Sequence, residues 1–484
     1  MHFLDLEKQT RRAFLRRSGQ LALTGTALPF ALNLAAMGEA AAFDANDYKA
    51  LVCVFMYGGN DYANTVVAYD DASYNKYSTI RGGGAGQTAG GIALAKADLA
   101  PTLLNPTIPL PGGRQYALHP NMTGMANLFN TGKAAVQLNV GPLVVPLTKA
   151  QYNSADRKTY PLPPKLFSHN DQQSIWQSSS PEGSTVGWGG NLGDLALSSN
   201  ATATFTCINV TGNAVFLSGD SALSYQVSTN GAVAISSVKS NVYGSSAVRA
   251  AMTSLIQQPR THILENEYNR VTARAVGAEA QITAALASAN LTTTFPAGNL
   301  SDQMKLVARL IAARNTLGNK RQVFLVSIGG FDLHDNLIAR HPGLLNSVSG
   351  AMTAFYNATV EMGVASQVTA FTASDFGRTL QSNGDGSDHG WGSHHFVVGG
   401  AVNGQAFYGT APEVSVGNTT AAADQWHVGQ GRLLPTTSVD QYAGTLAKWF
   451  GVADSEIASI LPNLRHFGAA AGRPDYPNSM GFMA

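Results

Sequence analysis

Acidic residues and histidines are concentrated in the segment FTASDFGRTLQSNGDGSDHGWGSHHFVVGG, residues 371–400. This segment holds three aspartates and three of the eleven histidines of the chain. Mixed carboxylate and imidazole ligands suit zinc, manganese or iron better than calcium, which prefers an all-oxygen site. The glycines between them allow the backbone to bend closely around an ion. The segment therefore predicts a divalent metal site, whose candidate ligands are Asp375, Asp388, His389, His394 and His395.

His394 and His395 are adjacent, and this limits how they can act together. In a strand, successive side chains point to opposite faces of the sheet. We therefore expect at most one of the two to face the metal.

Two further acids follow other apolar runs. Asp61 ends the run YKALVCVFMYGGND, and Asp332 ends the run RQVFLVSIGGFD, with His334 two residues later. If these runs and the one before Asp375 are parallel strands, their carboxyl ends share one edge of the sheet. Three carboxylates at that edge would repel one another unless a cation neutralised them. Each acid alone also fits an ordinary loop or helix start, but the three together favour a metal site.

Two residues outside this ligand set are candidates for contact with a substrate. Arg378 would either bind a phosphate or sulfate group with its guanidinium or form a buried ion pair with one of the acids. Ser168, in SHNDQQSIW, has the position of a helix N-cap, with Asp171 in the first turn. A serine or histidine at such a helix N-terminus could also face the same crevice.

The elements that must position these residues alternate between helix and strand. Helical spacing predicts helices over 120–132, 301–319 and 346–363, and apolar runs predict strands buried on both faces at 48–61, 133–143, 321–332 and 366–377. This alternation predicts a doubly wound α/β fold, with a mostly parallel sheet and helices on both faces.

One segment departs from that alternation. Residues 200–245 mix β-forming residues with turn residues and predict a small antiparallel excursion. The stretch 247–300 is mostly helical in pattern. We therefore expect a single domain over 43–484 with an insertion at about 200–300.

The first 42 residues have the pattern of an export signal. A basic stretch, TRRAFLR, precedes an uncharged Ala/Leu-rich run and the small residues GEAAA. The Arg11–Arg12 pair resembles the twin-arginine consensus, which implies the twin-arginine translocase as export partner and a periplasmic or secreted mature protein. A stable membrane anchor is disfavoured because polar residues and Pro29 interrupt the run.

The overall composition excludes some functions. The formal net charge of +1 argues against a nucleic-acid surface and against a polybasic membrane patch. Cys53 and Cys207 each lie in an apolar run, which favours buried free thiols, with a disulfide as the alternative.

Several motifs, taken in order, resemble one bacterial family. After the twin-arginine signal come GGND-x-x-NTVV, SHNDQQ-x-x-WQ, GGFDLHDN, SDFGRT, GSDHGWGSHHFVVGGAV and GRLLPTTSVDQYAGTLAKWFG with LPNL, between about residues 48 and 467. This order resembles the domain of unknown function 1501 family, in the alkaline phosphatase and sulfatase superfamily. The resemblance implies an alkaline phosphatase-like α/β core and a metal-assisted hydrolytic site for small or polymeric phosphate or sulfate esters at the strand ends.

The superfamily pattern also implies roles for individual residues. Asp61 resembles the metal ligand of the first strand, and Asp332 with His334 resembles an Asp with a nearby His ligand. Ser168 resembles a nucleophile at a helix N-terminus. One or two divalent ions are implied, and the absence of a Cys-x-Pro-x-Arg signature argues against a formylglycine sulfatase.

The chain departs from the superfamily pattern at one position. Asp375 resembles the acid of an adjacent Asp-His pair, but Phe376 stands where the histidine would be. The resemblance therefore implies that His389, His394 or His395 replaces that ligand or serves as a late one. A non-catalytic metal- or anion-binding protein on the same scaffold is the alternative to a hydrolase.

Overall fold

A computed structural model describes residues 45–82, 91–212 and 214–484 of the protein. The expected signal peptide, residues 1–42, lies outside this range. Among the described residues, none of the helices combines the length and the apolar character that a membrane span requires.

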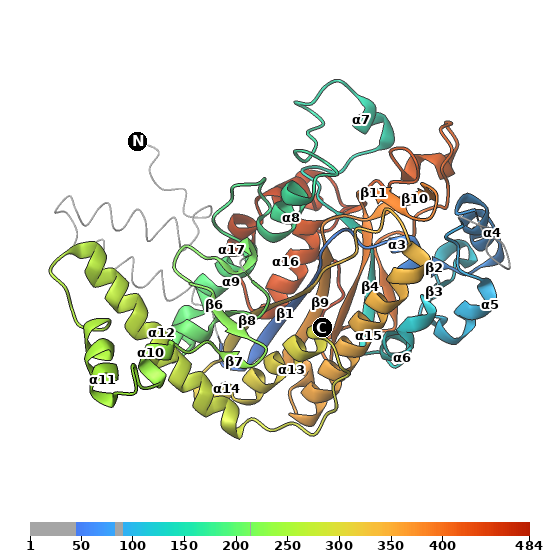
Figure 1. The fold of residues 1–484 in the computed structure, drawn as a ribbon. Coiled ribbons are helices and arrows are strands. Elements are labelled where there is room, and N and C mark those ends of the chain that lie inside the picture. Colours follow the sequence, from blue (N-terminus) through green and yellow to red (C-terminus); the bar gives the residue numbers. More distant parts are fainter. Residues whose placement is uncertain (1–44, 83–90, 213) are drawn as a thin grey trace, which may run out of the picture.

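A ten-stranded mixed sheet runs through the middle of the protein (Figure 1). At its centre lie three parallel neighbours, β9 (Val368–Ser374), β1 (Lys49–Met56) and β8 (Arg321–Ile328). β12 (Ser393–Gly399) runs antiparallel between β9 and β4 (Ala134–Gly141). The predicted strands at 48–61, 133–143, 321–332 and 366–377 are confirmed as β1, β4, β8 and β9, which run in the same direction.

The remaining strands complete this sheet and form two small ones. The order in the main sheet is β13-β4-β12-β9-β1-β8-β5-β6-β7, and β14 also pairs with β4. The bounds are β5 Cys207–Asn209, β6 Tyr225–Ser228, β7 Gly231–Ala232, β13 Ala406–Tyr408 and β14 Thr437–Ser438. Two antiparallel pairs stand apart: β2 (Val66–Ala68) with β3 (Tyr116–Leu118), and β10 (Arg378–Ser382) with β11 (Ser387–His389).

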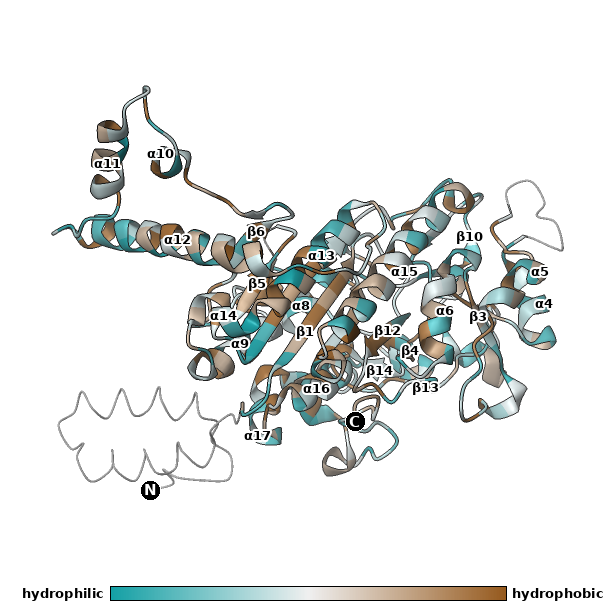
Figure 2. Ribbon diagram, turned by 90° about the horizontal axis from the view of Figure 1, so that it is seen from below, coloured by the Kyte–Doolittle hydropathy of each residue, from teal (hydrophilic) through white to brown (hydrophobic). Residues whose placement is uncertain are grey.

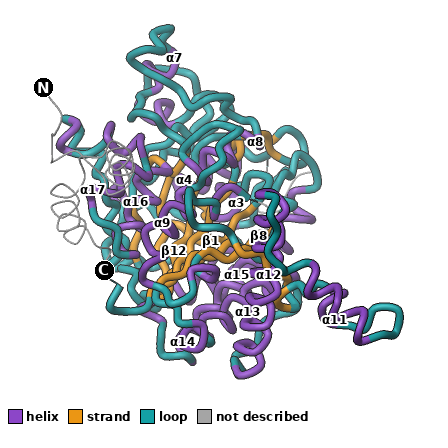
Figure 3. Tube along the Cα trace, turned by 90° about the vertical axis from the view of Figure 1, so that its left-hand side faces the viewer, coloured by secondary structure: helices purple, strands orange, loops and turns teal. Residues whose placement is uncertain are grey.

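Helices cover both faces of the sheet, as the doubly wound prediction requires (Figure 3). Side chains of β1 alternate between two cores: Val52 and Val54 pack on one side, and Cys53 and Phe55 on the other. The first core is closed by α6 (Thr123–Asn130), α13 (Asn299–Ala312) and α15 (Leu337–Glu361), and the second by α9 (Trp188–Ala196), α16 (Val439–Phe450) and α17 (Asp454–Ile460). Full burial of each large apolar side chain contributes about 1.5–3 kcal/mol, so both faces stabilise the sheet.

Shorter helices join these layers. They are α3 (Tyr62–Thr65), α4 (Asp71–Ile80), α5 (Lys96–Leu99), α7 (Lys149–Asn153), α8 (His169–Ser178) and α14 (Arg314–Leu317). Both cysteines are buried and free, which confirms the thiol prediction, and burial raises the pKa of each thiol, to about 12 for Cys207.

The segment 200–300 extends the sheet and then leaves it. β5 and β6 add to the sheet in parallel orientation, and β6 and β7 form an antiparallel pair. The chain then forms α10 (Ser236–Lys239), α11 (Ser246–Leu255) and α12 (Ile263–Ser288), of which α11 and the first half of α12 stand away from the sheet (Figures 1 and 2).

Helix α16 begins with a buried acid. Asp440 is 1% exposed and accepts hydrogen bonds from the backbone N–H and the side-chain amide of Asn463, at 3.2 and 3.4 Å. Burial raises the pKa of Asp440 to about 6, against the lowering effect of these bonds. In the folded protein the pKa of Asp440 lies above its ordinary value of 3.8, so its ionised form destabilises the folded state. This destabilisation grows as the pH rises from about 4 to about 6 and is complete above about pH 6.

Replacing Asp440 by asparagine should therefore stabilise the protein only at higher pH. We expect Asp440→Asn to raise the free energy of unfolding by about 3 kcal/mol at pH 8 and to have little effect near pH 4. Denaturant unfolding at the two pH values measures this difference. Asp302→Asn, which changes an exposed first-turn acid of α13, is the matched control and should show no such gain. Equal stability of Asp440→Asn and the unchanged protein at pH 8 would contradict the prediction.

Candidate metal centre

The carboxyl ends of β1, β8 and β9 bring their following residues together. Asp332 follows β8, Asp375 follows β9, and the turn after β1 passes between them because the Gly58 N–H donates to Asp375 Oδ2 at 3.2 Å. Gly58 has a φ of +117°, and a Cβ there would lie 2.3 Å from the Asp332 backbone nitrogen. The glycines of the YGGND turn are thus required for this close approach.

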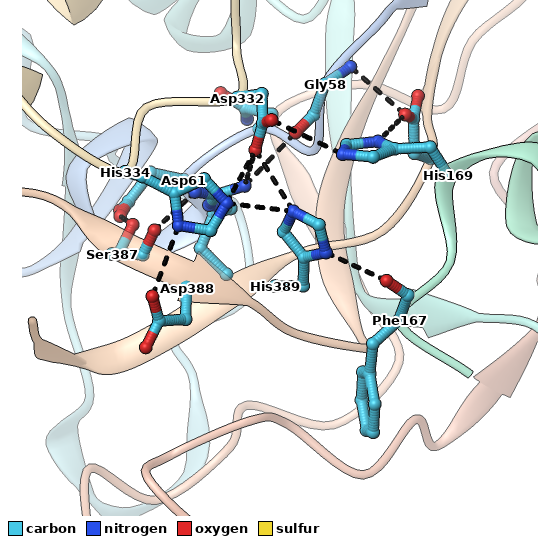
Figure 4. A network of polar contacts seen from close by, with 12 residues as sticks. Gly58, Asp61, Phe167, His169, Asp332, His334, Ser387, Asp388 and His389 are labelled. Carbon is cyan, nitrogen blue, oxygen red and sulfur yellow. Dashed lines mark hydrogen bonds and ion pairs between the residues drawn. The ribbon is translucent and has the colours of Figure 1, made fainter. Parts of the chain in front are cut away.

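Three histidines point their Nε2 atoms at Asp332 (Figure 4). The Nε2 atoms of His334 and His389 each lie 3.1 Å from Asp332 Oδ1, and His169 Nε2 lies 3.4 Å from Oδ2. They come from different elements: His334 from the loop after β8, His389 from the end of β11, and His169 from the first turn of α8. The tertiary fold therefore gathers three imidazoles around one partly exposed carboxylate.

Each histidine is held at its other ring nitrogen by a hydrogen-bond acceptor. His389 Nδ1 lies 2.8 Å from the Phe167 carbonyl oxygen, and a carbonyl can only accept. His169 Nδ1 contacts Asp375 Oδ2 at 2.6 Å, and His334 Nδ1 contacts Asp388 Oδ1 at 3.2 Å. All three rings therefore carry a proton on Nδ1 and, when neutral, a lone pair on Nε2. This outer support is the arrangement that orients metal-binding histidines.

The facing ring nitrogens and the carboxylate between them form a candidate cation site. The Nε2 atoms of His334 and His389 lie 3.0 Å apart, and both face Asp332 Oδ1. One ligand atom each from His169, Asp332 and His389 lies within 4.8 Å of the others, in the single such group found in the described part of the chain. Ligands about 2.1 Å from one tetrahedral ion are about 3.4 Å apart, so these residues fit a divalent ion.

Helix α8 contributes a candidate ligand, His169, which the sequence suggested only as an alternative to Ser168 at the helix N-terminus. His169 and Gln173 are four residues apart, so they share a helix face, and both donate to Asp375 Oδ2, the latter at 2.8 Å. Ser168 occupies the N-cap position, but its Oγ donates to Asp171 at 2.9 Å and does not cap the helix. The signal was the histidine beside the predicted N-cap in SHNDQQ.

Phe376, which directly follows Asp375, packs against two of the candidate ligands. Its ring centroid lies 4.8 Å from that of His169 and 4.6 Å from that of His389. A Cβ on Gly59 would lie 2.4 Å from the Phe376 ring, so the same glycine turn leaves room for it. Phe376 is 1% exposed and forms an apolar wall behind the two imidazoles.

Arg378 forms an ion pair, one of the two roles that its position suggested. Its buried guanidinium donates to Asp332 Oδ1 at 2.6 Å, to the Gly58 carbonyl oxygen at 3.2 Å and to the Ser387 carbonyl oxygen. Arg378 lies directly opposite His389 in the β10–β11 pair. The guanidinium therefore neutralises Asp332 and joins the hairpin to the strand ends.

Asp61 lies near these residues but has other partners. Its carboxylate pairs with buried Arg81 at 2.7 Å, accepts from Ser387 Oγ at 2.8 Å and caps α3 through the Asn64 N–H at 2.8 Å. The structure thus places Asp61 in the packing of α3 and outside the three-ligand group.

A match to a known protein family covers most of the chain. The family described as protein of unknown function (DUF1501) matches residues 48–461. The chain belongs to the DUF1501 family. No curated protein matches the sequence. The family resemblance of the motifs is therefore confirmed, and it does not by itself name an activity.

Several solved structures resemble this DUF1501 protein. The sulfatase PsFucS1 from Pseudoalteromonas sp. has 8% identity and a TM-score of 0.35, over 90% of this chain and 70% of that one. The lipoteichoic acid synthase LtaP from Listeria monocytogenes has 10% identity and a TM-score of 0.31, over 86% and 74%. Ps i-CgsB in complex with k-i-k-neocarrahexaose has 10% identity and a TM-score of 0.33, over 84% and 73%. These similarities are too distant to indicate an activity. The chemistry of the centre is therefore inferred from the side chains of this protein.

Two predicted ligands of the DUF1501 protein lie in the core. The His394 ring packs edge-on against Tyr62, with 5.2 Å between centroids, and His395 packs against Trp176 at 4.7 Å. Both are buried in β12, and burial lowers the pKa of each to about 3. As the strand geometry requires, the two rings have different neighbours, and neither belongs to the three-ligand group.

Charges around the centre favour the metal-binding forms of Asp332 and His389, but not that of His169. Burial opposes ionisation of Asp332, but the hydrogen bond and charge of Arg378 outweigh it and lower its pKa. Burial also lowers the pKa of His389. The hydrogen bond to Asp375 raises the pKa of His169, which makes this imidazole the more basic ligand. An ionised Asp332 beside a neutral His389 suits a divalent cation.

Proposed function

We propose that this protein is an exported, metal-dependent hydrolase of phosphate or sulfate esters, with His169, Asp332 and His389 as metal ligands. The observation that supports this most is the convergence of the histidine Nε2 lone pairs on Asp332, each ring being held at Nδ1. Mixed nitrogen and oxygen ligands favour zinc, manganese or iron over calcium.

Each residue of the centre has a separate role in this proposal. A bound divalent ion would polarise the ester oxygen and promote attack at phosphorus or sulfur. Asp375 and the Phe167 carbonyl orient the two imidazoles, Arg378 balances the charge of Asp332, and Phe376 excludes water from one side.

Ser168 is the proposed nucleophile. It directly precedes the ligand His169, and its Oγ–H already donates to Asp171, a carboxylate with a 4% exposed side chain. Asp171 is thus placed to accept the serine proton as Oγ attacks the phosphorus or sulfur atom and the alcohol of the ester leaves. Ser168→Ala should abolish ester hydrolysis and retain the metal. Unchanged hydrolysis by Ser168→Ala would assign the attack to water.

A non-catalytic metal-binding protein is the second candidate, and His334 supports it. Its Nε2 lies as close to Asp332 as that of His389. If His334 supplied a fourth protein ligand, a tetrahedral ion would have no open position for a substrate, as in structural zinc sites.

Metal analysis and an ester screen separate the two candidates. Mature protein from a native-like exporting host is examined by mass spectrometry for bound metal and incubated with aryl phosphates and aryl sulfates. One or two bound ions with hydrolysis support the enzyme. Bound metal without hydrolysis, together with weaker metal retention in His334→Ala, supports the closed binding site. Absence of metal, also after soaking with zinc, manganese or iron, would refute both.

Export is proposed from the first 42 residues. Replacing Arg11 and Arg12 by lysine should retain the precursor in the cytoplasm, because the twin-arginine pair is the feature that the translocase reads. Cell fractionation with immunoblotting measures this, and normal processing of the doubly substituted protein would contradict the assignment.

A further inference from the structure

The cations around the centre differ in how far they are already paired. Arg378 is bound to Asp332, and Arg81 is bound to Asp61. Lys165 lies between Asp171 and Glu182, at 3.6 and 3.9 Å. None of these three side chains is free to hold a new anion without giving up a carboxylate partner.

Arg432 is also anchored beside the centre, but by its inner atoms. Its Nε donates to the His389 carbonyl oxygen at 2.7 Å, and its guanidinium carbon lies 5.3 Å from the centroid of the Phe167 ring. Phe167 is the residue whose carbonyl orients His389, and it has a φ of +74°, which is rare for a bulky residue. Arg432 thus supports both sides of the His389–Phe167 contact.

The loop that carries Arg432 is closely packed. Gly431 has a φ of +71°, and a Cβ there would lie 2.3 Å from Leu380 Cβ on β10. Only glycine fits this approach, so the loop presses against the hairpin that holds His389. The position of Arg432 relative to the centre is therefore determined by backbone packing and not by its own charge alone.

Within the described part of the chain, the outer nitrogens of Arg432 have no direct partner, and Asp388 acts on Arg432 only through its charge at longer range. Among the described residues, no carboxylate oxygen lies within 4 Å of its side-chain nitrogens, and neither Nη atom makes a hydrogen bond. The side chain is half-buried. A rigid guanidinium whose two Nη groups are free can donate to two oxygens of one phosphate or sulfate group.

We propose that Arg432 binds the anionic group of the substrate, a phosphate or sulfate ester, beside the metal centre. This inference rests on the proposed function and assigns to Arg432 the role that the sequence suggested for Arg378. The stacked Phe167 ring and the bond to His389 hold the guanidinium, so that little side-chain entropy is lost when the anion binds.

Isothermal titration calorimetry of the metal-loaded mature protein with inorganic phosphate, and separately with sulfate, tests the proposal. Arg432→Gln should weaken binding of the preferred anion about 10–100-fold, the effect of losing a charge-assisted hydrogen-bond pair. Arg432→Lys should recover part of this loss. Metal content, measured by mass spectrometry, should stay at the level of the unchanged protein in both variants.

Arg465→Gln is the matched control, because it removes the same charge from an exposed arginine elsewhere. It should bind the anion normally. Unchanged anion binding in Arg432→Gln with full metal content would overturn the inference and leave the proposed function standing. Loss of metal in Arg432→Gln would also overturn it, since Arg432 would then act only by positioning His389. If the unchanged protein bound no metal, the proposed function would fail first, and this inference with it.

Discussion

Replacing Asp332 by alanine is expected to weaken metal binding by more than about 100-fold. Loss of a residue that only hydrogen-bonds to a metal ligand typically weakens binding by about 10–100-fold. Asp332 is the group on which all three histidine Nε2 atoms converge. The same change leaves the buried guanidinium of Arg378 without its carboxylate, which should lower the free energy of unfolding by about 1–3 kcal/mol. Mass spectrometry for metal and denaturant unfolding measure the two effects.

Asp335→Ala provides a matched control for Asp332→Ala. Asp335 is an exposed acid three residues away in the same loop, so the charge change is identical. This control should keep both metal and stability. If Asp332→Ala retained full metal content, the three-ligand centre would be refuted, whatever happened to stability.

Replacing Asp375 by asparagine is expected to weaken metal binding about 10–100-fold without abolishing it, because Asp375 contacts His169 and lies outside the three-ligand group. Its Oδ2 accepts from the Gly58 N–H, His169 and Gln173 in a fully buried position. An asparagine cannot serve all three donors, so the free energy of unfolding should fall by about 1–3 kcal/mol. Titration with zinc against a chelator measures the affinity.

Asp171→Asn separates the metal effect of Asp375→Asn from its effect on stability. Asp171 is also buried on α8, where it accepts from Ser168 and pairs with Lys165. Its replacement should cost stability and leave metal affinity unchanged. Equal zinc affinity in Asp375→Asn and the unchanged protein would show that His169 needs no acceptor at Nδ1, or that it is not a ligand.

Much of the fold and part of the centre were predictable from local pattern. Apolar runs ending in GGND, GGFD and SD predicted parallel strands, and parallel strands bring their carboxyl ends to one edge. That rule alone placed Asp332 and Asp375 near each other. It could not distinguish them from Asp61, because the same pattern precedes this acid, and only the tertiary structure shows that its carboxylate is paired with Arg81.

The choice among the histidines needed the tertiary structure. His389, His394 and His395 lie within seven residues, and the sequence gives no reason to prefer one of them as a metal ligand. In the structure, β12 buries His394 beside Tyr62 and His395 beside Trp176. His169 is separated from Asp375 by 206 positions in the sequence. Its place at the centre depends on how α8 packs against Asp375.

The family, the four parallel strands of the sheet and the types of possible ligand could be predicted from the sequence, because these depend on residue type and on periodicity along the chain. Only the tertiary structure decided which nitrogen faces which carboxylate, and which arginine is already paired. Those properties depend on distances of a few ångströms between segments separated by up to several hundred residues, and local pattern carries no information about them.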